Sequence, residues 1–382
     1  MTSEPKSKKF LIVLISTFLS ILFFYLLFFI KIHFERHDNA PHLFKSIDTL
    51  KFHQKYSSKL HHLRDSDGRW EIENQPENYL FSTINNFSNN TDNILIQGDS
   101  WAERMYFVEN SFNLFNNFAR KNNFGLINAG ITSYSPSLMQ LQYEILEKDF
   151  NIKPNIVVAY IDQTDIGDEL CRYKDKRVFN EKDILVNVKN ENYSRAAYDY
   201  TKIYNISEIT LLTKSKLTRS FKLANFFIKY GSLRLIEKFK SIDKYGWKNR
   251  DISKCRFSDI KKYLVSSNNK DISYFENRIK DYINLLINKE YIQKIILVTF
   301  PHRNHIPKYS NLNDKYSINV SSIVEKVIKN KRKISHLNFS KLIFDEKIYF
   351  ESDPFLKNDP GSHLNEEYQA NIFGREIINL LK

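Results

Sequence analysis

The sequence predicts an α/β fold: a flavodoxin-like three-layer α/β/α sandwich around a five-stranded parallel sheet. Two observations predict it. From Asn93 onward, short apolar runs rich in Ile and Val alternate with longer segments whose apolar residues recur at helical spacing. Strands that alternate with helices form a parallel sheet with helices on both faces. The chain has 382 residues, 42% of them hydrophobic, which is enough to bury a sizeable core.

The strands and helices can be placed one by one. Apolar runs predict strands at Ile94–Gln97, Gly125–Asn128, Asn155–Ile161, Lys294–Phe300 and near Ile334–Asn338. Helical spacing, with Pro136 at a first-turn position, predicts helices at Glu103–Lys121, Pro136–Phe150, Ser273–Lys289, Ser317–Lys331 and Asn365–Leu381. The alternation is interrupted from Asp168 to Lys270, which predicts a mainly helical insertion at about 168–270, after the third strand.

The N-terminal segment predicts a membrane anchor. Phe10–Ile30 is a run of 21 residues without a charge. As a helix it would be about 31 Å long, close to the thickness of a hydrocarbon core. Lys6, Lys8 and Lys9 precede it, and positive charge favours the cytoplasmic side of a membrane. We therefore expect a single-pass protein with a cytoplasmic N-terminus and an extracytoplasmic, periplasmic domain.

This prediction divides the chain into four parts. Residues 1–9 are a cytoplasmic tail, 10–30 the transmembrane helix, 31–90 a polar stem and 91–382 the α/β domain with its insertion. The domain contains both cysteines, Cys171 and Cys255. In an oxidising compartment they can form a disulfide, and otherwise they are two unpaired, buried thiols.

The insertion is strongly basic. The chain has a net charge of +13, and residues 214–262 contain 15 Lys and Arg but only 4 Asp and Glu. Because large apolar residues are interspersed with these cations, the segment can lie on an anionic membrane surface or bind an anionic glycan or lipid headgroup. It can also be an ordinary amphipathic helix with a solvated basic face. A segment expected outside the cytoplasm is not expected to bind nucleic acid.

Ser100 is the strongest candidate for a catalytic residue. It lies in Gly98-Asp99-Ser100-Trp101, between the first predicted strand and a helix. A serine on such a turn can present its hydroxyl at the carboxyl edge of a parallel sheet, where open α/β folds bind substrates. Backbone N–H groups at the start of the helix can stabilise an oxyanion. A serine in this place can also be a simple helix cap.

A candidate base lies near the C-terminus. The loop before the last helix reads Asp359-Pro360-Gly361-Ser362-His363, and in this fold it opens on the same sheet edge as Ser100. Asp359 can hydrogen-bond Nδ1 of His363 and leave Nε2 for a serine hydroxyl. By itself, His363 could equally be a solvent-exposed loop histidine.

Further polar residues are expected at this edge. His302, Arg303 and His305 follow the fourth strand, and they can contact substrate or form a salt-bridged loop network. No His or Cys spacing supports a metal site, and the sequence implies no cofactor.

Together these blocks resemble the SGNH (GDSL) hydrolase family. That family has Gly-Asp-Ser after its first strand, a glycine block after its second, an Asn block after its third and Asp-x-x-His before its last helix. The blocks here are Gly98-Asp99-Ser100, Asn128-Ala129-Gly130 and Asp359 with His363, and the resemblance covers residues 93–165 and 290–382.

The resemblance implies roles for these residues. Ser100 would be the nucleophile, His363 the general base and Asp359 the residue that orients the imidazole. The N–H groups of Ser100 and Gly130 would be oxyanion donors. The glycine can equally be explained by a tight turn that needs a positive φ.

Two positions depart from the family pattern. The third block reads Asp162-Gln163-Thr164-Asp165, so Thr164 stands where the family has Asn, and either its hydroxyl or the Gln163 side chain would replace the amide as an oxyanion donor. Asp359 precedes His363 by four residues rather than three, and Asp353 is the alternative carboxylate.

The resemblance implies a serine esterase that cleaves O-acyl or O-acetyl esters through an acyl-enzyme. If a glycan hydroxyl replaces water as the acceptor, the same site is an O-acetyltransferase that modifies a cell-envelope or exported glycan. The altered third block leaves a third alternative, a catalytically silent glycan-binding or scaffold protein on the same fold.

Overall fold

The computed structural model of the chain describes residues 6–35, 55–56, 59–60, 80–85, 92–188, 255, 257–306, 308, 319–345, 348–357, 359 and 361–382. They belong to two units, which we describe separately. The N-terminal helix α1 (Lys6–Glu35) is in the first unit, and all the other described residues are in the second. Most of the predicted stem and the centre of the basic insertion, 189–254, lie outside the described residues.

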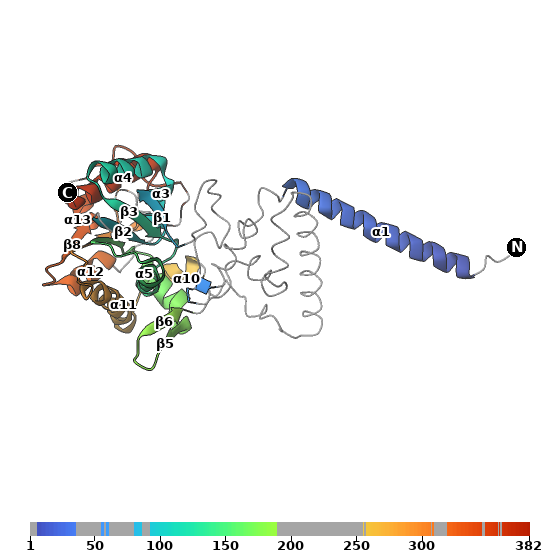
Figure 1. Ribbon diagram of the computed structural model, residues 1–382, viewed down its shortest axis with the longest axis horizontal. Helices are drawn as coiled ribbons and strands as arrows, with labels where there is room; N and C mark the ends of the chain where they lie inside the picture. The colour runs from blue at the N-terminus through green and yellow to red at the C-terminus, as the bar shows by residue number, and fades with distance from the viewer. Residues whose placement is uncertain are drawn as a thin grey trace. The chain divides into compact units, whose positions relative to one another are not determined.

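The second unit is built on a six-stranded sheet (Figure 1). The strand order is β1-β3-β2-β4-β7-β8, and all neighbours are parallel except β1 and β3. The strands are β1 (Ser82–Asn85), β2 (Asn93–Gly98), β3 (Gly125–Gly130), β4 (Ile156–Tyr160), β7 (Lys294–Thr299) and β8 (Ile334–Asn338). Strands β2 and β3 are buried along their whole length, as expected for a sheet covered on both faces.

The prediction of a purely parallel, five-stranded sheet is wrong by one strand. All five predicted strands are present, but β1 adds a sixth, antiparallel strand from the segment predicted to be a stem. Its four residues read Ser-Thr-Ile-Asn, which is too short and too polar to give a strand signal. Side chains alternate between buried and exposed along it, with Ser82 and Ile84 facing the core.

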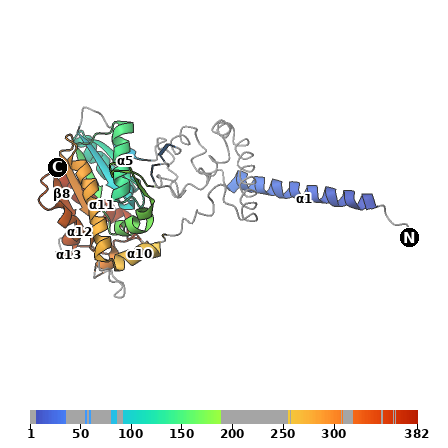
Figure 2. The ribbon, with the colours of Figure 1, turned by 90° about the horizontal axis from the view of Figure 1, so that it is seen from below.

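Helices cover both faces of the sheet. On one face lie α5 (Pro136–Phe150), α11 (Asn269–Ile287) and α12 (Val320–Ile328), which pack side by side (Figure 2). On the other face lie α3 (Ser100–Phe107), α4 (Glu109–Lys121), α13 (Phe339–Phe344) and the C-terminal segment, which comprises α14 (Glu366–Tyr368), a π-helical turn (Gln369–Gly374) and α15 (Arg375–Leu381). The three-layer arrangement places the ends of the strands between these helices.

The helix predicted at Glu103–Lys121 is two helices. Val108 has extended backbone angles, φ −78° and ψ 112°, and separates α3 from α4. Asp99 caps α3, because its side chain accepts a hydrogen bond from the Trp101 N–H. The helix therefore begins at Ser100 itself, three residues earlier than the sequence pattern indicates.

The described part of the insertion is only partly helical. After β4 the chain forms a short helix, α6 (Asp165–Gly167), a π-helical turn (Asp168–Tyr173) and a 3₁₀ turn (Lys174–Lys176). The antiparallel pair β5 (Arg177–Phe179) and β6 (Leu185–Val188) follows, and α10 (Phe257–Val265) leads back to α11. The basic segment 214–262 is described only at its C-terminal end, so its predicted contacts with a membrane or a glycan lie outside the described residues.

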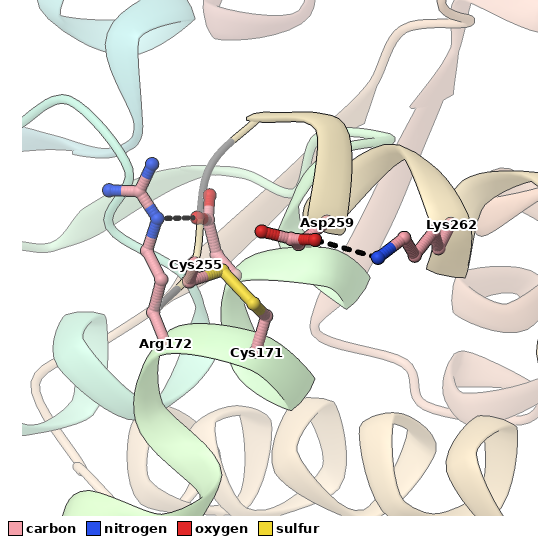
Figure 3. The surroundings of a disulfide bond; sticks show 6 residues. Cys171, Arg172, Cys255, Asp259 and Lys262 are labelled. Atoms are coloured by element: carbon pink, nitrogen blue, oxygen red, sulfur yellow. Dashed lines mark hydrogen bonds and ion pairs between the residues drawn. A yellow bond between two sulfur atoms is a disulfide. The ribbon is translucent and has the colours of Figure 1, made fainter. Parts of the chain in front are cut away.

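A disulfide joins the two ends of this insertion. Cys171 on the π-helical turn is bonded to Cys255, just before α10, with the Cα atoms 5.6 Å apart (Figure 3). The sequence left open whether the two cysteines form a disulfide or are unpaired buried thiols, and the structure contains the disulfide. The bond fixes the position at which the chain returns from residues 189–254 to the α/β core.

The structure corrects the predicted membrane anchor. The uncharged run Phe10–Ile30 is the central part of α1, which continues beyond it into charged residues at both ends. Among the described residues, no helix has the length and apolarity needed to cross a membrane. The prediction of a transmembrane helix at 10–30 is therefore wrong, and so is the single-pass, extracytoplasmic location that depended on it.

Candidate active site

Ser100 lies on the turn between β2 and α3. Strand β2 ends at Gly98, whose φ of 148° is outside the range that other residues readily adopt. A Cβ at Gly98 would also be 2.5 Å from Cβ of Tyr160 on the neighbouring strand. The glycine therefore permits the sharp turn that places Ser100 at the carboxyl edge of the sheet.

Three side chains from distant parts of the chain form a hydrogen-bonded series at this edge. The Ser100 Oγ is 2.6 Å from Nε2 of His363. The other ring nitrogen, Nδ1, is 2.7 Å from Oδ2 of Asp359. Because a carboxylate can only accept, Nδ1 carries the proton and Nε2 is left to accept a hydrogen bond from the serine hydroxyl.

The loop around His363 is folded about the Asp359 carboxylate. This carboxylate also accepts hydrogen bonds from the backbone N–H of His363, at 2.6 Å, and of Gly361, at 3.2 Å. Burial alone would raise the pKa of Asp359, but the hydrogen bonds from His363 and Gly361 outweigh burial and hold the pKa below its ordinary value. Asp359 therefore stays ionised beside the imidazole. The other carboxylate, Asp353, is paired with Arg303 at 2.6 Å.

Two further contacts fix the backbone on the C-terminal side of His363. Leu356 N–H donates to the His363 carbonyl at 2.9 Å, within a short antiparallel bridge between Phe355 and Leu364. Arg104, one turn after Ser100 on α3, donates from its guanidinium to the Leu364 carbonyl at 3.0 Å. The helix that begins at the serine is thus bonded directly to the loop that holds the histidine.

The imidazole is also held by aromatic packing. The His363 ring lies 5.5 Å from the Trp101 ring, which is itself stacked on Tyr160 and packed against Phe300. The side chains of His363 and Asp359 are only 14% and 18% exposed. The hydrogen bonds between them are therefore largely shielded from water, which strengthens them.

Gly130 does not offer the oxyanion donor that the family resemblance implied. Its N–H donates to the side chain of Asn128 at 2.8 Å. A Cβ at Gly130 would clash with the backbone nitrogen of Glu103 and would be 2.6 Å from the carbonyl carbon of Ala102. The glycine is required by the close approach of β3 to α3, and its amide is already engaged.

Thr164 and Gln163 are also engaged elsewhere. The Thr164 hydroxyl and N–H both donate to the carboxylate of Asp162, as does the Gln163 N–H. The Gln163 side chain accepts from the Val320 N–H at the start of α12. The third block thus folds around its own aspartate, because a buried carboxylate needs hydrogen-bond donors.

Ser133 is a further candidate site residue, which the sequence motifs do not reveal. It lies in the turn Ile131–Tyr134 after β3, and its φ of 64° is in the left-handed region that favours glycine. Its carbonyl accepts from the Tyr173 hydroxyl, and no acceptor for its N–H lies among the described residues. The turn begins beside the end of β2, two residues before Ser100, since the Ile131 N–H donates to the Gly98 carbonyl. A glycine-like conformation at a serine leaves no sequence signal.

Four buried carboxyl groups lie behind the site: Asp99, Asp162, Asp165 and Asp168. Burial raises the pKa of each of them, and their mutual repulsion raises the pKa of Asp99 and Asp165 well above the ordinary value. The pKa of Asp168 is raised to about 7 by burial, against the opposing effect of Arg172, whose Nε is 2.7 Å away. Burial therefore favours the protonated form of these groups. Nowhere in the described part of the chain do three His, Cys, Asp or Glu side chains form a group that could hold a metal ion.

Comparison of the sequence with protein-family models and with curated proteins finds no match.

Proposed function

We propose that the protein is a serine hydrolase that cleaves O-acyl esters, with O-acetyl esters as the simplest substrates, and that it resembles the SGNH type. The observation that carries this proposal is the series Ser100–His363–Asp359, with separations of 2.6 and 2.7 Å. A serine whose hydroxyl is bonded to an imidazole that is in turn oriented by an ionised carboxylate is equipped for nucleophilic catalysis.

The reaction follows the usual two steps of acyl transfer. The Ser100 Oγ attacks the acyl carbonyl while its proton passes to Nε2 of His363, giving a tetrahedral oxyanion. The intermediate collapses with cleavage of the C–O bond, and Nε2 returns the proton to the leaving alkoxide. Water then attacks the acyl-Ser100 ester by the same proton transfers and releases the acid. Asp359 stabilises the imidazolium in both steps without taking the proton.

The oxyanion would be stabilised by backbone amides. The N–H of Ser100 is in the first turn of α3, where amides have no intrahelical acceptor. The N–H of Ser133 is the second donor that we assign, in place of Gly130 and Thr164. With two amide donors and without a side-chain donor, we expect modest turnover, because one oxyanion-hole donor contributes roughly 10²–10³ in rate.

The test is labelling of the full-length protein with a fluorophosphonate probe, which reacts with activated serines. We expect wild-type protein to be labelled at Ser100 and the Ser100→Ala variant to be unlabelled. Ser322→Ala, which removes an exposed serine of α12, is the matched control and should be labelled like wild type. A folded wild-type protein that is not labelled would rule out the proposal.

The acyl acceptor can be tested with a chromogenic acetyl ester. Release of the chromophore with water alone supports hydrolysis. If release requires an added glycan or other alcohol, and the acetyl group is recovered on that alcohol, the same acyl-enzyme serves an O-acetyltransferase. The two outcomes share Ser100, His363 and Asp359 and differ only in the nucleophile of the second step.

A further inference from the structure

A second serine–histidine pair lies next to the first. Ser362, the residue before His363, has its Oγ 2.9 Å from Nε2 of His302, in the loop after β7. Both side chains are buried, with Ser362 only 2% and His302 only 6% exposed. The pair is therefore covered by protein and joins the loop after β7 to the loop that carries His363.

This pair is not built for nucleophilic attack. Nδ1 of His302 accepts a hydrogen bond from the Asn304 N–H at 3.3 Å and so caps the 3₁₀ turn Arg303–His305. If Nδ1 accepts, the neutral ring carries its proton on Nε2 and donates it to the Ser362 hydroxyl. His302 is thus a donor to Ser362, whereas His363 is an acceptor from Ser100.

Ser362 has an unusual backbone conformation for its position. Its φ of 57° is in the left-handed region, which non-glycine residues rarely adopt. The surrounding structure must hold such a residue in place, and residues of this kind are concentrated at functional sites. The contact that fixes the Ser362 side chain is the hydrogen bond from His302, and the next residue in the chain is His363.

We infer that His302 is a positioning residue for the proposed reaction: by holding Ser362 in its left-handed conformation, it sets the direction in which the His363 imidazole leaves the backbone. The inference rests on the proposed function, because it assigns His302 an effect on the base of that reaction. Nε2 of His363 is held 2.6 Å from Ser100, and a shift of a few tenths of an ångström in the loop would lengthen that hydrogen bond.

Two substitutions of His302 separate its hydrogen bond to Ser362 from its hydrogen bond with the Asn304 N–H. The amide of Gln can place a donor near the position of the imidazole Nε2, so His302→Gln keeps the bond to Ser362 and loses the cap on Asn304 N–H. The amide oxygen of Asn lies near the position of Nδ1, so His302→Asn keeps the cap and loses the bond to Ser362. The variants are matched because each removes one bond of the same buried side chain.

We expect His302→Asn to lower kcat for a chromogenic acetyl ester 10- to 100-fold with KM unchanged, and His302→Gln to stay within threefold of wild type. The rate of fluorophosphonate labelling of Ser100 should fall in parallel with kcat. Ser362→Gly, which tolerates the positive φ but lacks the hydroxyl, should lose as much as His302→Asn. The double variant should lose no more than either single variant, because both remove the same bond.

The inference is overturned if His302→Asn and His302→Gln have the same kcat, or if the losses of Ser362→Gly and His302→Asn multiply in the double variant. It is also overturned if kcat simply follows the fall in melting temperature. A second readout does not depend on activity: the NMR signal of the Nδ1 proton of His363 in its bond to Asp359. This signal should broaden or shift in His302→Asn and not in His302→Gln.

The two proposals can fail separately. If wild-type Ser100 is not labelled, the proposed function fails, and the NMR comparison still decides whether His302 orients His363. If Ser100 is labelled in wild type and equally fast in His302→Asn, the proposed function stands and the inference about His302 fails.

Discussion

Ser100 and His363 are 263 positions apart in the chain, and their side chains meet with Oγ 2.6 Å from Nε2. The sheet makes this contact possible, because the turn after β2 and the loop before the last helix open on the same edge. The contact is reinforced on both sides of the histidine, by His302 through Ser362 and by Arg104 through the Leu364 carbonyl. The candidate active site thus depends on long-range packing for its geometry.

In the proposed mechanism, Asp359 orients the imidazole of His363, the general base. We expect Asp359→Asn to lower kcat roughly 10²–10⁴-fold, since an amide can donate to Nδ1 and so favour the wrong tautomer of His363. Steady-state turnover of an acetyl ester is the measurement. Asp353→Asn is the control, because Asp353 is paired with Arg303 and makes no contact with the imidazole among the described residues. A larger loss in Asp353→Asn than in Asp359→Asn would contradict the assignment.

Two glycines near the site should respond differently to alanine. In Gly130→Ala the new Cβ would lie within 2.8 Å of backbone and side-chain atoms of Glu103 and Ala102, so we expect a loss of about 3 kcal/mol in the free energy of unfolding. In Gly361→Ala the new Cβ would lie 2.6 Å from Cε1 of His363. Because that clash moves a side chain, the second variant should keep its stability and lose activity.

Urea denaturation and ester turnover, measured on both variants, test this contrast. Gly130→Ala should show a lower denaturation midpoint with an unchanged slope, and Gly361→Ala should show a lower kcat with a midpoint near that of wild type. An active, fully stable Gly130→Ala would mean that β3 and α3 can separate without cost.

Much of the fold can be predicted from the sequence, because it depends on local patterns. The five apolar strands and the helices α5 and α11 have strong periodicity, and they are present close to their expected bounds. The sequence could not predict β1, whose four residues become a strand only by pairing with β3. It also could not predict the break at Val108, since helical spacing continues from α3 into α4. Both features are decided by tertiary contacts.

The candidate site, like the fold, can be predicted from the sequence only in part. Ser100, His363 and Asp359 stand out because their spacing along the chain fits successive strand–helix loops. The oxyanion donors do not stand out in the sequence, because a backbone N–H can bind an oxyanion only if no nearby side chain already accepts its hydrogen bond. Asn128 takes the Gly130 N–H and Asp162 takes the Thr164 hydroxyl, and neither contact is visible in a motif.

Thr164 provides a direct test of this correction. If its hydroxyl stabilised the oxyanion, Thr164→Val would lower kcat roughly 10²–10³-fold. We expect less than a tenfold change in kcat and a loss of about 1–2 kcal/mol of stability, because buried Asp162 would lose a hydrogen bond. Thr164→Ser, which keeps the hydroxyl, should retain wild-type stability. Turnover and urea denaturation of the two variants distinguish the two roles.

The disulfide should contribute substantially to stability. Cys171 and Cys255 are 84 positions apart, and closing a loop of that length stabilises the folded state by about 4.5 kcal/mol in the chain-entropy model. We expect the Cys171→Ser/Cys255→Ser double variant to unfold at lower urea concentration than oxidised wild type. Reduced wild type should behave like the variant. If reduction leaves the midpoint unchanged, the bridge does not constrain the unfolded chain.

His336 should make stability depend on pH in a defined window. It lies on β8 with Nε2 2.8 Å from the Thr299 hydroxyl, and burial lowers its pKa from 6.5 to about 4. Between pH 6.5 and 4 the unfolded chain therefore binds a proton at His336 that the folded chain does not. Stability from this group is complete above pH 6.5 and is lost as the pH falls toward 4, by about 3 kcal/mol in total.

The His336→Gln variant isolates this contribution. Glutamine can still donate to Thr299, but it does not titrate, so the variant should lose less stability than wild type between pH 7 and pH 4. Other groups titrate in the same range, and the buried Asp168, with its pKa of about 7, is one of them. The comparison is therefore the difference between wild type and variant at each pH, measured by urea denaturation, in which the common contributions cancel. Parallel curves for the two proteins would show that His336 is protonated equally in the folded and unfolded states.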